Sequence, residues 1–307
     1  MLPYKFFLNP RYWPTWLELA FLRLSICLPL RYQRLIGRAT GRLLCLLLSK
    51  RRHIVKTNIA LCFPEHSPEY QAKMVAEVFE NNAIGFFETA MAWWSSPQKL
   101  SKQVKITGLE HIEQAQAQGK GVLLIGAHYS TLDLGGFLFG QTQALSTVYR
   151  PHNNELLDYF LRKGRGRFTE NLIDNRNTRG IIRSLKTGNV VWIAPDQDMG
   201  PKHSIYVPFF GQDAATVTTV TKLARLSKAK VMTLAQYRLP KDQGYELRVS
   251  PPLEAFPSDD EYMDTCRVNT AIEEAIRKYP TQYMWVHRRF KTHPKGKGHL
   301  YRTLDKH

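Results

Sequence analysis

Residues 121–133 read GVLLIGAHYSTLD, an apolar run that ends in a histidine and, five residues later, an aspartate. A short all-apolar run bounded by glycine is typical of a β-strand that is buried on both faces. Comparable strands are predicted at 145–149, 190–195, 230–237 and 245–249. Helices are predicted between the strands. One follows the first strand and ends near 139, and others cover 154–163, 178–186, 214–227 and 260–278. This alternation predicts an α/β fold with a largely parallel central sheet flanked by helices.

The stretch before this sheet, from Ser49 to about Gln116, is predicted to be helical. Its segment 75–94, VAEVFENNAIGFFETAMAWW, carries a long aromatic face that we interpret mainly as core packing. A second interpretation stays open, in which some of the aromatic side chains line a slot for a hydrocarbon chain: Phe86, Phe87, Trp93 and Trp94.

The histidine and aspartate that follow the first strand are candidates for acid–base chemistry. Five residues of regular helix rotate by about 500°, so His128 and Asp133 meet only if the histidine ends the strand or turn. The aspartate must then lie in the first helical turn. A carboxylate on one imidazole nitrogen fixes the tautomer and leaves the other nitrogen free to accept a proton. The alternative is a structural histidine without a chemical role.

Charged residues also follow the later strands. Arg150 and Arg165 are predicted to bind a phosphate or carboxylate group of a substrate, because guanidinium groups hold such anions through paired hydrogen bonds. Asp196 and Asp198 follow the strand at 190–195, where carboxylates can bind a metal, pair with those arginines or cap a turn. Only one histidine that could complete a metal site, His203, lies close to these aspartates in sequence. We therefore expect Asp196 and Asp198 to form ion pairs and to bind substrate, and we expect no metal site.

Composition excludes several classes of protein. The 307 residues carry 43 Lys and Arg against 26 Asp and Glu, a net charge of +17, and 43% of them are hydrophobic, which excludes a disordered chain. The four cysteines have no spacing typical of a zinc site or a disulfide framework, so reduced thiols are predicted. The aromatic residues lie in apolar runs rather than among the basic clusters, so no nucleic-acid partner is expected.

The first sixty residues carry much of the positive charge, with eleven Lys or Arg and one acid, Glu18. Apolar stretches alternate with arginines there, and Trp13 and Trp16 stand at the boundary, a pattern typical of a helix lying in a membrane interface. A single tilted span and ordinary core helices are the two alternatives. We predict that residues 1–50 form a membrane-associating helical segment and that 51–307 form the catalytic domain.

Several stretches spread over nearly the whole chain form an ordered set of motifs: NPRYWPTW (9–16), CFPE (62–65), ETAMAWW (88–94), GAHYSTLDLG (126–135), YRPHNN (149–154), RKGRGR (162–167), APDQD (194–198), PFFG (208–211) and QYMWVHRRFKT (282–292). In this order they resemble the motifs of the late lipid A acyltransferases of Gram-negative bacteria. These lauroyl- and myristoyl-transferring enzymes belong to the lysophospholipid acyltransferase superfamily.

The resemblance implies transfer of a fatty acyl chain from an acyl-carrier-protein thioester to a hydroxyl of the Kdo-bearing lipid A precursor. It places the catalytic dyad on His128 and Asp133, makes Arg165 functionally required and matches Asp196 to an aspartate of the family pattern. The implied partners are acyl carrier protein, an anionic glycolipid and the membrane surface. No cofactor is implied beyond the acyl-carrier-protein co-substrate, and the implied location is the cytoplasmic face of the bacterial inner membrane.

One departure from the family pattern keeps an alternative open. Late lipid A enzymes commonly carry Glu where this chain has Asp133, and Asp at that place matches acyltransferases that act on glycerol phosphate or lysophospholipid. Those enzymes are expected to show an F-P-E-G block, whereas this chain has A-P-D-Q-D at 194–198.

Overall fold

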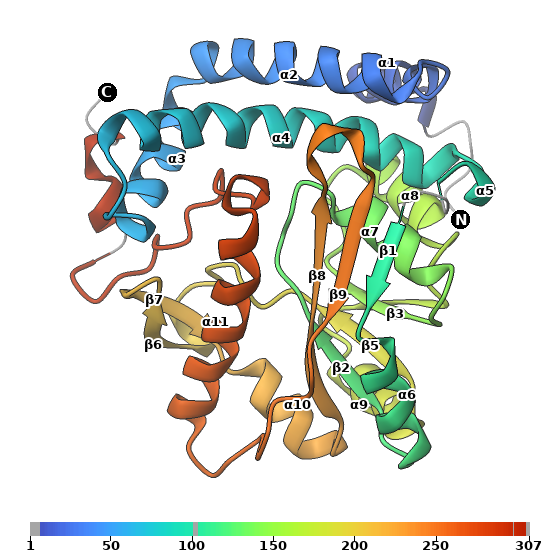
Figure 1. Cartoon of the computed structure of the whole chain (residues 1–307), viewed down its shortest axis with the longest axis vertical. Helices are drawn as coiled ribbons and strands as arrows, with labels where there is room; N and C mark the ends of the chain where they lie inside the picture. The colour runs from blue at the N-terminus through green and yellow to red at the C-terminus, as the bar shows by residue number, and fades with distance from the viewer. Residues whose placement is uncertain (1–6, 101–103, 297, 305–307) are drawn as a thin grey trace.

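The computed structural model describes residues 7–100, 104–296 and 298–304 (Figure 1). Within these residues the main sheet has seven strands in the order β1-β9-β8-β2-β5-β3-β4, and a two-stranded sheet, β6-β7, stands beside it. The strands are β1 (Val104–Thr107), β2 (Val122–Ile125), β3 (Ser146–Tyr149), β4 (Asn171–Asp174), β5 (Val190–Ile193), β6 (Ser204–Phe209), β7 (Gln212–Val217), β8 (Lys230–Arg238) and β9 (Tyr245–Val249).

The main sheet is largely parallel, as predicted. Strands β2, β3, β4, β5 and β8 run parallel to their neighbours among themselves, and β9 returns antiparallel to β8 before pairing in parallel with β1. Every residue of β2 and β5 is buried, which accounts for their uninterrupted apolar sequences.

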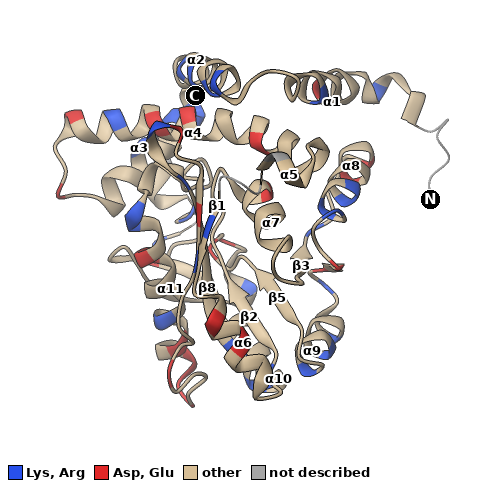
Figure 2. Ribbon diagram, turned by 45° about the vertical axis from the view of Figure 1, so that its right-hand side comes forward, with Lys and Arg blue, Asp and Glu red and all other residues tan. Residues whose placement is uncertain are grey.

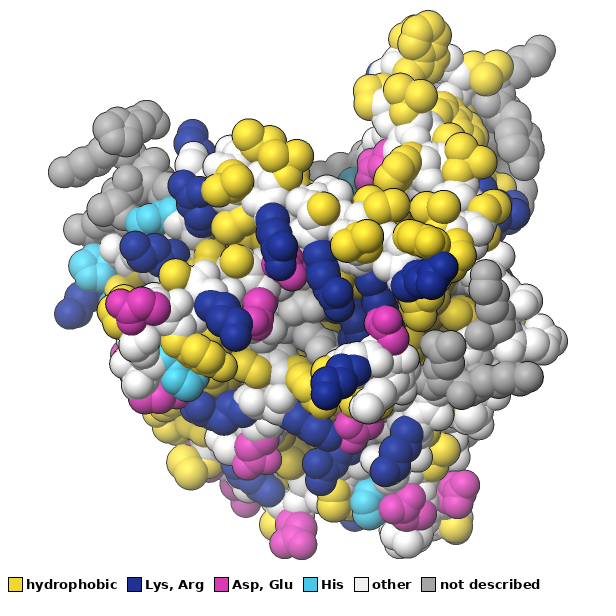
Figure 3. Space-filling model, turned by 45° about the horizontal axis from the view of Figure 1, so that its top comes forward, with side chains coloured by type: hydrophobic (Ala, Val, Ile, Leu, Met, Phe, Trp, Pro, Cys, Tyr) yellow, Lys and Arg dark blue, Asp and Glu magenta, His cyan; other side chains and the backbone are white. Residues whose placement is uncertain are grey.

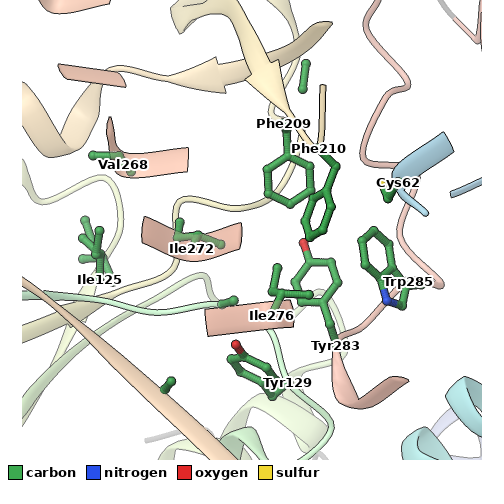
Figure 4. Close-up of a cluster of buried hydrophobic side chains, with 14 of the residues drawn as sticks. Cys62, Ile125, Tyr129, Phe209, Phe210, Val268, Ile272, Ile276, Tyr283 and Trp285 are labelled. Carbon is green, nitrogen blue, oxygen red and sulfur yellow. The ribbon is translucent and has the colours of Figure 1, made fainter. Parts of the chain in front are cut away.

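Two helical layers cover the sheet. One layer consists of α6 (Leu109–Ala117), α7 (Leu132–Gly140) and α8 (Glu155–Arg165), whose buried side chains share one apolar cluster. The other consists of α9 (Thr178–Lys186), α10 (Thr219–Ser227) and α11 (Glu261–Lys278), which share a second cluster. Figure 4 shows part of this second cluster, where Phe210, Tyr283, Trp285 and Ile276 point toward one another.

The remaining helices lie across the end of the molecule toward which β8 points (Figure 1). They are α1 (Trp13–Ser25), α2 (Leu30–Leu47), α3 (Ser49–Cys62), α4 (Pro68–Trp94) and α5 (Pro97–Leu100). Helix α2 lies along α4, and glycine makes the close approach possible. A Cβ on Gly41 would stand 2.6 Å from the backbone oxygen of Phe79, so a larger residue there would force the helices apart.

The outer side of α1 and α2 is apolar and basic. Leu17, Phe21 and Leu24 of α1 follow one another at helical spacing and are 73%, 57% and 70% exposed. Figure 3 shows hydrophobic side chains gathered on this side of the molecule with Lys and Arg between them. Among the described helices, none has both the length and the apolar composition that crossing a bilayer requires.

Three short elements differ from the sequence prediction. Residues 104–107 and 171–174 form β1 and β4, edge strands of four half-exposed residues whose sequences lack an apolar run. The predicted helix at 214–227 begins only at Thr219, because residues 212–217 pair with β6 as the hairpin strand β7. Phe210 and Gly211, both with positive φ, make the turn of that hairpin.

Candidate active site

The register of two neighbouring strands brings a histidine and an aspartate together. Strands β2 and β5 pair in parallel with Ile125 opposite Ile193. His128 and Asp196 each stand three residues beyond these paired positions. Both side chains therefore reach the same height at the carboxyl edge of the sheet, where parallel α/β folds place their chemistry.

Asp196 holds the imidazole of His128 through two hydrogen bonds. Nδ1 of His128 lies 2.7 Å from Oδ1 of Asp196, and the backbone N–H of His128 donates to Oδ2 at 2.9 Å. The Asp196 side chain is fully buried, whereas that of His128 is 24% exposed. Burial works against ionisation of Asp196, but the charge and hydrogen bonds of His128 outweigh it and lower the pKa of Asp196 to about 2. An ionised carboxylate can only accept a hydrogen bond, so in the neutral form of the imidazole the proton lies on Nδ1 and Nε2 is the free acceptor.

The loop that carries His128 is fixed on two further sides. The C-terminal segment pairs with it, since the Ser130 N–H donates to the Gln282 carbonyl and the Met284 N–H donates to the His128 carbonyl, both at 2.8 Å. Helix α4 touches it from the other side at Gly85, where a Cβ would stand 2.3 Å from the backbone oxygen of Ser130. Only glycine permits this contact, so the imidazole is held between α4 and the C-terminal segment.

Asp133 has a different partner from the one that its motif indicated. It lies in the first turn of α7, as predicted, but its Oδ1 accepts a hydrogen bond from Nε of Arg165 at 2.7 Å. Both side chains are largely buried, at 11% and 16% exposed. The carboxylate on the imidazole is thus that of Asp196, because the strand register places Asp196 beside Nδ1 while Asp133 faces the end of α8.

These groups border a cavity of about 730 Å³ whose lining is mostly apolar. His128, Asp133, Arg150 and Arg165 all line it, so the structure brings four of the six predicted site residues to one cavity. Its wall also includes residues from α4, α8, α9 and the loops beyond β4 and β5: Asn82, Gly85, Phe86, Thr89, Leu161, Asn175, Ile181, Met199 and His203.

The other two predicted substrate-binding residues, Asp196 and Asp198, have positions that correct the prediction. Asp196 is buried behind His128 and contacts its imidazole. Asp198 is also buried, and its carboxylate accepts hydrogen bonds from the Thr292 backbone N–H at 2.5 Å, the Thr292 hydroxyl at 2.9 Å and the Gly200 N–H at 2.8 Å. With its oxygens occupied in this way, Asp198 anchors the C-terminal segment.

Sequence reasoning did not identify His287 as part of this region. Its Nε2 accepts a hydrogen bond from the Asp198 N–H at 3.3 Å, and burial lowers its pKa to about 4, so the ring is neutral near pH 7. Of the aromatic residues considered for a hydrocarbon slot, Phe86 lines the cavity, whereas Phe87 and Trp93 are buried in the core.

Neither a metal cluster nor a disulfide is found in the part of the chain that the structure describes. No group of three or more His, Cys, Asp or Glu side chains is placed to hold an ion there. The four cysteines are free thiols.

Comparison with known proteins gives a consistent family match. Residues 4–292 match the family model described as bacterial lipid A biosynthesis acyltransferase. The chain is 41% identical over 290 residues to the lipid A biosynthesis lauroyltransferase of Escherichia coli, covering 94% of this chain and 95% of that protein. It is 40% identical over 296 residues to the palmitoleoyltransferase of the same organism, covering 96% of each chain.

A more distant relative and a solved structure are also similar to this chain. The E. coli lipid A biosynthesis myristoyltransferase is 28% identical over 303 residues, which is 98% of this chain and 94% of that protein. Among solved structures, the 1-acyl-sn-glycerophosphate acyltransferase of Thermotoga maritima aligns with a TM-score of 0.38 and 14% identity, over 83% of this chain and 99% of that one.

Proposed function

We propose that this chain, which belongs to the bacterial lipid A biosynthesis acyltransferases, transfers a fatty acyl chain to a hydroxyl of the Kdo-bearing lipid A precursor. The donor in this proposal is the thioester of acyl carrier protein. The observation that carries the mechanism is the His128–Asp196 pair at the edge of a largely apolar cavity, with Nε2 of the imidazole open to it.

The pair supports a general-base mechanism without a covalent enzyme intermediate. Nε2 of His128 removes the proton of the acceptor hydroxyl as its oxygen attacks the thioester carbonyl carbon. The ionised Asp196 stabilises the imidazolium that forms. When the tetrahedral intermediate collapses, the carbon–sulfur bond breaks and the imidazolium returns its proton to the leaving sulfur, giving an ester and a free carrier thiol.

Arg165 is the residue we assign to anionic groups in the cavity. Asp133 uses only the Nε donor of Arg165 and thereby fixes the direction of the guanidinium. The Nη donors remain for a substrate phosphate or for the oxyanion of the tetrahedral intermediate, and one such donor is typically worth about 2.7–4 kcal/mol in the transition state. Arg150, exposed where the cavity meets the surface, fits a contact to the anionic head group.

The acceptor lipid is proposed to enter from the side of α1, α2 and α4. Phe86 of α4 is 54% exposed and also lines the cavity, so an apolar side chain continues the exposed hydrophobic surface to the site. In this arrangement α1 and α2 lie in the membrane interface and arginines of α2 face lipid phosphates. Residues 1–50 act as the anchor, at the cytoplasmic face of the inner membrane.

The membrane proposal is tested on the exposed face of α1. Leu17→Glu/Leu24→Glu is expected to reduce co-sedimentation with anionic phospholipid vesicles at least tenfold, because two exposed apolar contacts are replaced by charges. The control, Leu226→Glu/Tyr262→Glu, changes two exposed apolar residues of α10 and α11 and is expected to bind as the wild type does. Equal binding of both variants would contradict the assignment of this face.

The reaction is tested with purified protein, acyl carrier protein carrying acyl chains of several lengths, and the Kdo-bearing lipid A precursor in mixed micelles. Mass spectrometry is expected to show the precursor gaining one acyl ester, and His128→Ala is expected to abolish the product. Glycerol 3-phosphate and lysophospholipid are offered in parallel. Preferential acylation of either one would replace the proposed acceptor by the alternative class.

A further inference from the structure

A second basic surface lies at the β4 edge of the sheet, on a different side of the cavity from α4. It consists of exposed cations on the two helices that flank this edge, which we call the β4-edge surface: Arg162 and Lys163 of α8 and Arg179, Arg183 and Lys186 of α9. Figure 2 shows Lys and Arg on both helices along the side of the molecule that also carries β3.

The cations of α9 form a row on one face of the helix. Arg179, Arg183 and Lys186 are spaced by four and three residues, which places them on the same side. The opposite side carries Ile181 and Leu185, both buried. Among the described residues, none of the three cations has an acidic partner or a side-chain hydrogen bond, so their charges are available to a binding partner.

The row is connected to the cavity through the same helix. Ile181 lines the cavity from its inner side, and Asn175, one residue beyond β4, stands beside it in the wall. Met199, which is 54% exposed, and His203 complete this part of the mouth. A protein seated on the β4-edge surface could therefore pass a tethered group directly into the cavity.

The β4-edge surface differs from the face assigned to the membrane. No large exposed hydrophobic side chain lies on the described residues of α8 or α9, whereas α1 and α2 carry many. Interfacial helices need such side chains to enter the lipid. A row of unpaired cations beside a cavity fits a water-soluble anionic protein, since complementary charge steers association and fixes orientation.

We propose that the β4-edge surface docks the acidic carrier protein that delivers the acyl thioester, with α9 as its main contact, while the lipid enters past α4. The inference rests on the proposed function, because it names where the donor of that reaction binds. It divides the substrates between two sides of one cavity, so that the thioester reaches His128 from the β4 edge and the hydroxyl reaches it from the membrane side.

The test reverses charge on α9 and measures binding apart from turnover. Arg179→Glu/Arg183→Glu is compared with Lys105→Glu/Lys230→Glu, which reverses two exposed cations of β1 and β8 that lie away from the mouth and have no acidic partner within the described part of the chain. Fluorescence anisotropy of labelled holo-carrier protein is expected to show at least tenfold weaker, salt-dependent binding for the α9 variant and less than twofold change for the control. Because this readout needs no product, it stands even if the acceptor lipid proves to be a different one.

Kinetics then separate docking from chemistry. With the α9 variant, KM for the acylated carrier protein is expected to rise at least tenfold. Turnover of the acyl thioester of free phosphopantetheine, a donor without the carrier protein, is expected to change less than twofold. An equal loss with both donors would overturn the proposal, because it would indicate a distorted cavity. It would also be overturned by unchanged carrier-protein binding, or by a loss confined to binding of anionic phospholipid vesicles.

Discussion

Replacing Asp196 by Asn is expected to abolish catalysis by reversing the tautomer of His128. The two carboxylate oxygens accept from the backbone N–H of His128 and from its Nδ1–H. An asparagine has one acceptor oxygen, and the backbone N–H can be satisfied only by that oxygen. The amide NH₂ must then face Nδ1, which forces the ring proton onto Nε2 and removes the base.

The expected size of this effect is large. Loss of the correct tautomer in a comparable histidine–carboxylate pair, the serine protease triad, lowers kcat by about 10⁴-fold, equivalent to about 5.4 kcal/mol of activation free energy. The measurement is kcat at saturating donor and acceptor, with a thermal melt to show that the variant is folded. A folded Asp196→Asn enzyme with kcat within tenfold of wild type would refute the assignment of Asp196 to the imidazole.

Asp133→Asn is the matched comparison, since its carboxylate contacts Arg165 and leaves the imidazole tautomer unchanged. We expect Asp133→Asn to lower kcat less than Asp196→Asn does, because Nε2 of His128 still faces the cavity as the base. The Asp196 carboxyl, with its pKa near 2, stays ionised throughout the accessible range. A wild-type level of activity in Asp196→Asn together with an inactive Asp133→Asn would favour the pairing indicated by the motif.

Three further outcomes are expected. The pKa of Asp196 is about 2 in the folded protein and 3.8 in the unfolded chain, so its ionisation stabilises the fold above pH 4 by about 2 kcal/mol. Urea denaturation of the wild type should show this contribution to the free energy of unfolding disappear as the pH falls toward 2. Asp196→Asn, which has no carboxylate to protonate, should not show the loss. In kcat/KM, Asp133→Asn and Arg165→Gln should be non-additive by about 1–3 kcal/mol, and additive losses would show that the two act separately. Gly85→Ala should cost about 1–3 kcal/mol of stability and lower kcat, since its Cβ meets the Ser130 carbonyl; a melting temperature and kcat equal to wild type would contradict the contact between α4 and the loop.

The buried part of the fold could be predicted because its strands are apolar without interruption. The runs at 121–127 and 190–195 correspond to β2 and β5, whose residues are all buried. The edge strand β1 escaped prediction because Val104–Thr107 is only four residues long and half exposed, too short to stand out from the helical stretch predicted around it. Small residues in 212–217 likewise resemble a helix start until the hairpin turn is known.

The site could be predicted only as far as single motifs reach. His128, Asp133 and Arg165 were identified by their places after strands or in a basic cluster, and all three line the cavity. The prediction that Asp133 is the partner of the His128 Nδ1 was wrong. The actual partner depends on β5 lying beside β2, and strand order is a tertiary property that local spacing does not encode. Asp196 had been identified as a site residue, but with a different task.

The equal distance of His128 and Asp196 from Ile125 and Ile193 has an evolutionary consequence. One residue inserted between Ile193 and Asp196 would move the carboxylate by about 3.3 Å along the strand direction. A shift of that size would break its hydrogen bonds to His128. Either connection can therefore lengthen only if the other does so in step. The three-residue spacings from Ile125 to His128 and from Ile193 to Asp196 therefore have to match. Descendants of this sequence should accept insertions and deletions in the flanking loops before they accept a change in the length of either spacing.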